Sequence, residues 1–363
     1  MKMLKAMKQM NKSTRSNLIT VGLLVIMFVV VQVMIANGSV SNLMQGLLVP
    51  LCYYSILAVS LNLTVGILGE LSLGHAGFMC IGAFTGAFFS KVTVNVIENS
   101  FIRFTMAILI GAVSAAIFGV LIGVVVLRLR GDYLAIVTLA FGEIIKNVIN
   151  VIYIGRDSNG FHFSMKDTVH LKLEKGGEVI IGGAKGITGT PKDTNFTIAL
   201  ILLIIIYLII ANLVNSRSGR AIMAIRDNRI AAESVGINIT KFKILAFSIS
   251  AAMAGIAGVL YSHNLSSLSA TPKNFGYNMS IMILVFVVLG GIGNLRGSII
   301  AAIVLTLLPE YLRFLQDYRM LIYAIVLIIM MIFNWNPRCI AWRKNHSVKG
   351  MLQVFMKSRR KEA

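Results

Sequence analysis

The sequence predicts an all-α integral membrane protein with about ten transmembrane helices, and two observations carry this prediction. The 363-residue chain is 57% hydrophobic and only 13% charged, with a mean hydropathy of +0.82, whereas soluble domains carry roughly a quarter charged residues. Its apolar residues also gather in runs that approach the ~20 residues a helix needs to cross a bilayer. The runs lack the alternation typical of a membrane barrel, so we expect the spans to be helices.

Ten apolar runs are expected to form the spans. The first follows five basic residues, as in a secretory signal peptide, but its 19 residues suit a retained helix better. The third is short and rich in glycine, which is typical of a broken or re-entrant helix. The runs lie near residues 18–36, 43–66, 72–90, 104–127, 133–154, 195–214, 244–262, 277–293, 298–312 and 320–334.

The positive charges predict the orientation of these spans. The formal net charge is +20, but lysine and arginine lie in short segments between apolar runs, so we expect no nucleic-acid partner. With the N-terminus in the cytoplasm, most of them fall in inner segments, as retention of positive loops requires. We therefore expect a cytoplasmic N-terminal segment 1–17, a membrane domain 18–335 and a cytoplasmic tail 336–363 in a cell membrane. The membrane domain includes an extracytoplasmic loop 156–193 and a cytoplasmic loop 215–243.

Small residues and thiols in the spans indicate close packing. Gly82-x-x-x-Gly86 and Gly119-x-x-x-Gly123 would let helix backbones approach one another. The cysteines have no metal-like spacing, so we expect packing thiols without ligand or disulfide roles. They are Cys52, Cys80 and Cys339.

One face of the run 133–154 is polar. Glu143, Lys146, Asn147 and Asn150 fall at i, i+3, i+4 and i+7. Because a charge at the centre of a lone helix costs roughly 2.5–3.5 kcal/mol, this face must pack on protein or line water. Either an ion pair between Glu143 and Lys146 fixes helix packing, or the face borders a translocation pathway. The second interpretation adds Thr138, Glu143 and Asn147 to the candidate pathway residues.

A second polar site is the stretch GILGELSLGHAGF, residues 66–78. Its glycines surround Glu70, Ser72 and His75. Glycines that interrupt an apolar segment are how transporters break a helix and expose backbone groups to a substrate. Ser72 and His75 are therefore candidate pathway residues, although a tight cytoplasmic turn with a structural histidine explains the stretch as well. The other histidines share no ligand spacing with His75, so we expect no metal site.

Motifs for chemistry are missing. The sequence contains no G-x-x-x-x-G-K-[ST], no G-x-S-x-G elbow and no H-E-x-x-H. The stretch GGIGNLRG (290–297) lacks the third glycine of a dinucleotide fingerprint and is expected to be an inner turn with Arg296 at the membrane surface. We therefore expect a non-catalytic chain that binds no cofactor itself.

The polar stretch RDNRIAAESVGINITKFK, residues 226–243, interrupts the apolar sequence. Asp227 or Asn228 is expected to cap a short helix, and Gly236 to end it. Its small residues would let another surface come close, and its arginines would meet acids or lipid headgroups. Judged by composition alone, a basic linker that satisfies the positive-inside rule explains the loop equally well.

The alanines of this stretch carry a family resemblance. A-A-x-x-x-G resembles the coupling motif of ABC importer permeases, E-A-A-x-x-x-G, with Ile230 in place of the glutamate. The chain as a whole resembles the M-type permease subunit of branched-chain amino acid importers, except for an insertion-like segment near 156–181. The stretches that carry the likeness are LNLTVGILGELSLGHAGFMCIGAFTGA (61–87), LRLRGDYLAIVTLAFGEIIKNV (127–148), AIRDNRIAAESVGINITKFKILAFSISAAMAGIAGVLYS (224–262) and GGIGNLRGSIIAA (290–302).

The resemblance implies an ABC importer permease architecture with a cytoplasmic coupling helix. It implies half of a translocation pathway for Leu, Ile or Val, completed by a second, related permease subunit. It also implies two ABC ATPase subunits that hold ATP and Mg²⁺, an extracytoplasmic amino-acid-binding protein and surrounding membrane lipid. The residues it assigns to coupling with the ATPase are Arg226, Arg229, Ala231, Ala232 and Gly236.

Three alternatives remain open at this point. The chain could be a secondary transporter that uses Glu143, Lys146 and His75 as an ion or proton relay. It could be an ABC permease for another small solute, such as urea. It could also be a membrane scaffold without transport activity.

Overall fold

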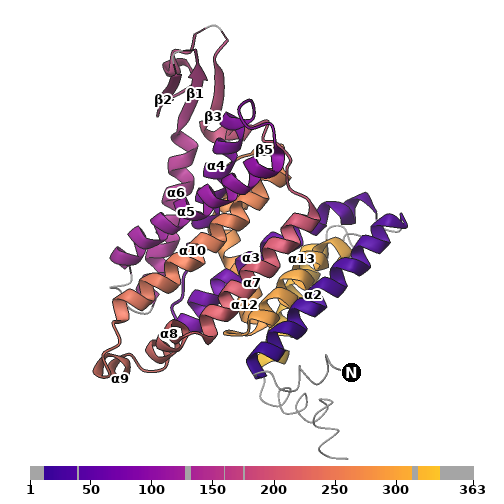
Figure 1. Cartoon of the computed structure of the whole chain (residues 1–363), viewed down its shortest axis with the longest axis vertical. Coiled ribbons are helices and arrows are strands. Elements are labelled where there is room, and N and C mark those ends of the chain that lie inside the picture. The colour runs from indigo at the N-terminus through magenta and orange to yellow at the C-terminus, as the bar shows by residue number, and fades with distance from the viewer. Residues whose placement is uncertain are drawn as a thin grey trace, which may run out of the picture. The chain divides into compact units, whose positions relative to one another are not determined.

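Long apolar helices occupy the ten positions that the sequence predicts (Figure 1). The computed structural model describes residues 12–38, 41–126, 132–158, 160–174, 176–312 and 318–335. The helices are α2 (Lys12–Ala36), α3 (Asn42–Asn62), α4 (His75–Thr93), α5 (Ser100–Val126), α6 (Asp132–Val151), α7 (Phe196–Asn215), α10 (Ile239–Asn264), α12 (Tyr277–Gly290), α13 (Leu295–Tyr311) and α14 (Arg319–Trp335).

Eight of the described helices are long and apolar enough to cross a membrane, with 19 to 27 residues each. The remaining two predicted spans, α13 and α14, have 17 residues each. The chain forms two compact units, Met1–Ile303 and Val304–Ala363. The tail 336–363, which includes Cys339, and most of the N-terminal segment 1–17 lie outside the described residues.

Backbone contacts between glycines join α4, α5 and α10, the closest-packed helices of the first unit. A Cβ atom added to Gly82 would lie 2.2 Å from the carbonyl oxygen of Gly255, and one added to Gly258 would lie 2.1 Å from that of Met79. Gly255 in turn faces the Gly111 carbonyl oxygen of α5, 2.6 Å from an added Cβ. Only glycine permits such approach, so the predicted close packing around Gly82 is confirmed.

The third predicted span is the continuous helix α4, so the prediction of a broken or re-entrant helix there is wrong, and the break lies between the second and third spans. The chain leaves α3 through a π-helical turn, η1 (Leu63–Leu68), and then runs without helix from Gly69 to Gly74 before α4 begins. Gly69 has a φ of +80°, a backbone conformation that favours glycine. We call residues 69–74 the break segment.

The loop that follows α6 is a small antiparallel sheet, an addition to the expected helices. Its strands β1 (Tyr153–Asp157), β2 (Gly160–Ser164) and β3 (Glu178–Gly182) lie in the order β2-β1-β3. A second sheet pairs β4 (Ile187–Thr188) with β5 (Ser267–Leu268). The strands have two to five residues, too few for a clear alternation in the sequence.

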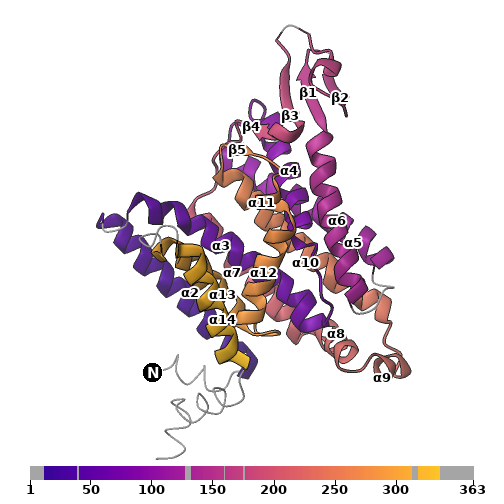
Figure 2. The same cartoon turned by 180° about the vertical axis from the view of Figure 1, so that it is seen from behind.

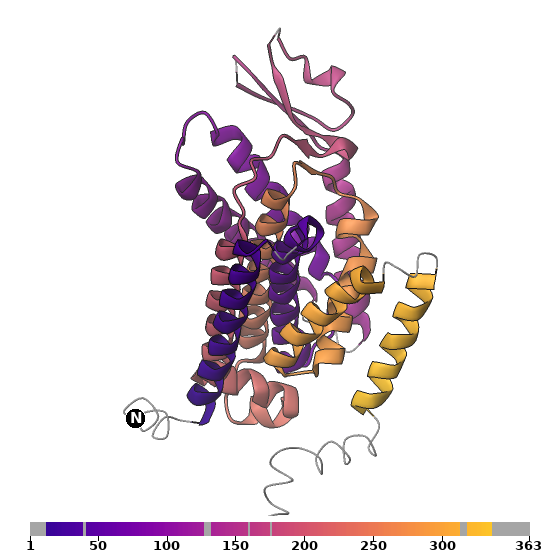
Figure 3. The same ribbon diagram turned by 90° about the vertical axis from the view of Figure 1, so that its right-hand side faces the viewer.

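The sheet and the short helices α8 (Arg217–Asp227) and α9 (Arg229–Ser234) lie at opposite ends of the first unit (Figure 2, Figure 3). At the sheet end, the Lys91 ammonium of α4 lies 2.9 Å from the Glu178 carboxylate of β3. The break segment lies toward the other end, because η1 packs on α8. Helix α4 therefore runs from the break to the sheet end.

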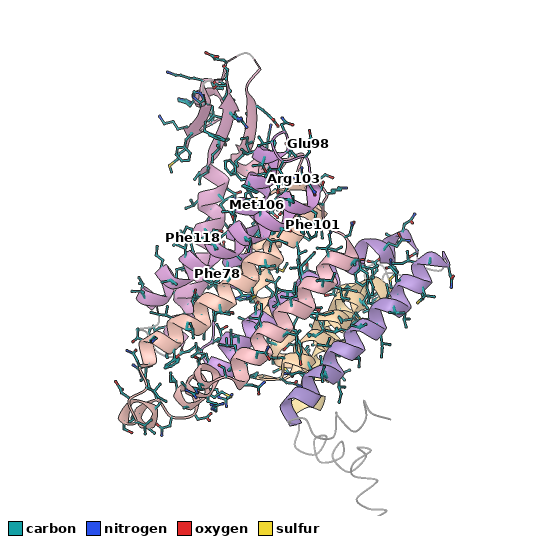
Figure 4. The ribbon with its side chains drawn as sticks, in the orientation of Figure 1. Phe78, Glu98, Phe101, Arg103, Met106 and Phe118 are labelled. Carbon is teal, nitrogen blue, oxygen red and sulfur yellow. The ribbon has the colours of Figure 1, made fainter. Side chains whose placement is uncertain are left out.

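A buried ion pair ties the loop after the sheet to α5. The Arg103 guanidinium lies 2.8 Å from the Asp193 carboxylate, and both side chains are about one-tenth exposed. Arg103 also donates to the carbonyl oxygen of Ile97, 3.1 Å away. Figure 4 labels Arg103 at the end of α5 nearest the sheet, close to Glu98. The same view follows α5 through Met106 to Phe118, both exposed and apolar, as expected for a surface in contact with lipid or another apolar partner.

We predict that Gly82→Ala lowers the melting temperature of the detergent-solubilised protein. Its methyl group would force α4 away from Gly255, and overpacking of this kind costs about 1–3 kcal/mol. The matched control is Gly46→Ala in α3, where an added Cβ meets nothing within 4 Å. That change should leave the melting temperature unchanged or raise it. Equal effects of the two substitutions would contradict the close helix contact.

Candidate functional site

The polar stretch 226–243 folds as a short helix held between two longer ones. The side chain of Asn228 caps α9, because its Oδ1 accepts a hydrogen bond from the Ala231 amide at 3.1 Å. Asn238 caps α10 in the same way, accepting from the Lys241 amide at 3.0 Å. The predicted cap at Asn228 is confirmed.

Gly236 ends α9 as predicted. Its φ is +84°, its amide donates to the Glu233 carbonyl at 3.0 Å, and the Ile237 amide donates to the Ala232 carbonyl at 3.1 Å. This pair of bonds is a Schellman motif, which needs a left-handed residue at the glycine position. The turn between α9 and α10 is therefore short and fixed in direction.

Some apolar side chains at α9 are buried against the neighbouring helices, and others are exposed on the surface. Ala232 is only 3% exposed and packs with Ile225 of α8 and Ile239 of α10. Ile230 and Val235 are 81% and 74% exposed. Ala232 thus anchors α9, and the surface open to a partner is formed by Ile230, Ala231 and Val235. The exposure of these two residues was not predicted from sequence, although apolar residues in a charged loop are a visible signal of a docking surface.

Arg226 also turns toward its own chain. One guanidinium nitrogen, Nη1, donates to the carbonyl oxygen of Gly66 in η1 at 2.9 Å, and Nε and Nη2 bind the Asp227 carboxylate at 3.1 and 2.9 Å. The stem of Arg226 lies over Gly69, where an added Cβ would be 2.5 Å from its Cγ. Arg229, half-buried, lines a cavity beside this contact. The roles of both arginines in coupling remain predictions.

An ion pair joins the break segment to α10. The Lys243 ammonium binds the Glu70 carboxylate, and these side chains are 5% and 17% exposed. Beside the pair lies a cavity of about 550 Å³. Its lining includes Leu68, Gly69, Glu70, Arg226, Arg229 and Lys243.

The candidate pathway residues of the break lie together. Thr138 of α6 accepts a hydrogen bond from the Leu73 amide at 3.0 Å, and the His75 ring lies 2.7 Å from the Ser60 hydroxyl of α3. The Ser72 hydroxyl has no hydrogen-bond partner among the residues that the structure describes. Ser72, His75 and Thr138 are all buried, so this conformation holds them away from an open path.

The polar face of α6 packs mostly on protein. Glu143 pairs with Lys146 and accepts the amide of Tyr277, the first residue of α12, at 2.8 Å. The Asn150 amide donates to the carbonyl oxygen of Ala270 at 2.9 Å. Asn147 is exposed. Glu143 and Asn150 therefore fix neighbouring segments, Lys146 pairs with Glu143 on the same helix, and Asn147 is exposed toward a partner or a pathway.

Apolar spanning helices, a non-helical segment between two of them and a small helical hairpin at one end are the features of a multi-pass membrane permease. Residues 43–331 match the family described as the branched-chain amino acid transport system permease component, and the chain belongs to this family.

Similar proteins agree with this assignment. The high-affinity branched-chain amino acid transport system permease protein LivM of Salmonella typhimurium is 36% identical over 84% of this chain and 70% of its own length. LivM of Escherichia coli K12 is also 36% identical, over 78% of this chain and 67% of its own length. The ribose import permease protein RbsC of Escherichia coli is 25% identical over 86% and 91%. No solved structure matches the chain.

We predict that Glu143→Ala destabilises the protein more than Asn147→Ala. The first change leaves Lys146, which is 6% exposed, without the carboxylate that it binds, and breaking a buried pair costs on the order of 3 kcal/mol. The second removes an exposed amide on the same helix. Thermal unfolding in detergent measures both. If the Glu143→Ala protein melted at the same temperature as the unsubstituted protein, the ion pair would not stabilise helix packing.

Proposed function

We propose that this chain is the transmembrane permease subunit of an ATP-driven ABC importer for the branched-chain amino acids Leu, Ile and Val. Membership of the permease family and the likeness to LivM support the substrate class. The observation that carries the mechanism is the helical hairpin α8–α9, which exposes apolar side chains at one end of the membrane domain and is tied to η1 and α10.

In this proposal the α8–α9 end faces the cytoplasm and the sheet end faces outward. The basic composition of the loop 215–243 supports that orientation, because positive loops are retained on the cytoplasmic side. Both chain termini then lie in the cytoplasm.

The partners follow from the two ends. An ABC ATPase subunit docks on Ile230, Ala231 and Val235, and ATP with Mg²⁺ binds to the ATPase subunits, so this chain catalyses nothing and holds no cofactor. A second, related permease subunit completes the pathway, and two ATPase subunits serve the pair. An extracytoplasmic amino-acid-binding protein delivers the substrate at the sheet end.

Transport then depends on movement of the hairpin. ATP-driven closure of the ATPase pair displaces α9, and the fixed Gly236 turn carries the displacement into α10. The buried pathway candidates Ser72, His75 and Thr138 become accessible when the break segment moves. Substrate would thus cross only in step with ATP hydrolysis.

Uptake into proteoliposomes tests the proposal. The chain is assembled with a second permease, the ATPase subunits and the binding protein, and accumulation of labelled leucine is followed with and without enclosed ATP. We expect accumulation with ATP alone, reduced by excess isoleucine or valine and unaffected by ribose or urea. Uptake by this chain alone, without ATP, would instead identify a secondary transporter.

We predict that Gly236→Val reduces leucine uptake while Gly236→Asn retains most of it. A β-branched residue at a φ of +84° is strained by about 1–3 kcal/mol, whereas asparagine adopts the left-handed region more readily. An added Cβ meets nothing within 4 Å at this position, so the backbone conformation is tested without a steric clash.

Gly189→Val is the matched control for this prediction. Gly189 also has a positive φ, +75°, and open space around it, but it lies beside the strand β4 at the other end of the molecule. Its substitution should leave uptake within about twofold of the unsubstituted importer, because the strain is the same and the hairpin is untouched. Equal losses at both glycines would point to general destabilisation.

A further inference from the structure

The contacts between the hairpin and the break segment assign a function to three charged side chains beyond docking. We propose that Arg226 and the ion pair of Glu70 with Lys243, together called the latch, transmit movement of α8–α9 and α10 to the break segment 69–74. The three are positioning residues: they contact no substrate, and they determine the position of the break segment. The inference rests on the proposed function, since it concerns how ATP-driven movement reaches the pathway.

The first half of the latch is a side chain that reaches from α8 to η1. The Arg226 guanidinium donates to the Gly66 carbonyl at 2.9 Å, and its stem covers Gly69. A charged donor on a backbone carbonyl makes a stronger hydrogen bond than a neutral one. The contact therefore holds the last residues of η1 to α8, directly before the chain turns into the break segment.

The second half of the latch comes from the other side of the hairpin. Lys243 lies in the first turn and a half of α10 and binds Glu70, the second residue of the break segment. Lys243 is nearly fully buried, so separating the two charges would leave an uncompensated ammonium in a low-dielectric setting. Helix α10 and Glu70 are thus expected to move together.

A fixed support lies next to the latch. The Asn62 side chain accepts from the Gly293 amide at 2.8 Å and donates to the Ser298 hydroxyl at 2.7 Å. Gly66 touches the same turn, with an added Cβ 2.3 Å from the Gly293 nitrogen. Gly66 is therefore held from two sides, by the turn between α12 and α13 and by Arg226 of the latch. Displacement of α8 relative to that turn must therefore act on Gly66 and on the break segment that follows it.

The surroundings allow the latch to move. The cavity of about 550 Å³ borders Glu70, Arg226 and Lys243, so these side chains have space on one side. Beyond the latch, the buried Ser72 hydroxyl has no hydrogen-bond partner in the described part of the chain. A buried hydroxyl without a hydrogen-bond partner is unfavourable. Movement of the break segment that exposes Ser72, or gives it a partner, therefore breaks no hydrogen bond of this hydroxyl.

The test separates transmission from docking. Arg226→Ala is compared with Arg220→Ala, whose arginine is exposed on α8 and donates to the carbonyl oxygen of Asn215, the last residue of α7. Each variant is assembled with its partners, and three quantities are measured: co-purification of the ATPase, ATP hydrolysis stimulated by the binding protein, and leucine uptake. We expect Arg226→Ala to retain the ATPase and to hydrolyse ATP, but to lose about tenfold in uptake, as a loss of coupling near 1.4 kcal/mol would give. Arg220→Ala should match the unsubstituted importer in all three.

Exchange of the two charges in the ion pair of Glu70 with Lys243 is a second, independent test of the latch. Glu70→Lys or Lys243→Glu alone should uncouple uptake from hydrolysis, and the double exchange should restore uptake, because the pair is rebuilt with its charges swapped. Deuterium exchange of residues 63–74 gives a readout that does not use transport. Adding ATP should change exchange there in the unsubstituted complex, and the change should be absent in Arg226→Ala.

Three results would overturn the latch. One is uptake by Arg226→Ala and by Glu70→Lys within twofold of the unsubstituted importer. Another is loss of ATPase co-purification by Arg226→Ala at an unchanged melting temperature, which would make Arg226 a docking residue. The third is an ATP-dependent change in exchange at residues 63–74 that persists in Arg226→Ala. Failure of the proposed function is distinct from all of these, since the unsubstituted complex would then show no ATP-dependent uptake.

Discussion

The direct backbone contact between α4, α5 and α10 is the constraint on which the rest of the structure depends. Within a bilayer, moving an apolar side chain from lipid to protein gives no hydrophobic free energy. Helices therefore associate through close van der Waals contact and hydrogen bonds. Gly82, Gly255 and Gly258 bring these backbones together. With α4 fixed against α10, Leu73 just before α4 lies beside Thr138, in the second turn of α6. The chain between η1 and α4 covers the remaining distance as the non-helical break segment.

Polar groups that enter the membrane domain are matched to partners from distant parts of the sequence. Glu143 joins α6 to the start of α12, Glu70 joins the break segment to α10, and His263 joins α10 to Ser90 of α4. Each contact meets the cost of placing a polar group in a low-dielectric region. The contact of Glu70 with Lys243 also fixes the break segment against α10.

Local features of the fold could be predicted from sequence, because they depend on neighbours in the chain. The positions of ten apolar helices, eight of them long and apolar enough to cross a membrane, follow from length and hydropathy. The cap at Asn228 and the left-handed Gly236 follow from side-chain chemistry. The burial of Ala232 could not be predicted, because it depends on how α9 folds back on α8 and α10. The partnership of Glu70 with Lys243 joins residues 173 positions apart, a separation that no spacing rule covers. Whether the assigned residues contact an ATPase or a substrate remains a prediction.

The π-helical turn before the break has a geometric consequence. A π turn closes its hydrogen bonds over five residues, so it contains one residue more than the α-helical turn it replaces. If η1 changed to the α-helical form, that residue would pass into the break segment, and the end of the helix would rotate by about 100°. The six residues Leu63–Leu68 therefore store a small length of spare backbone. The break segment could therefore lengthen by one residue without the unwinding of any other helix.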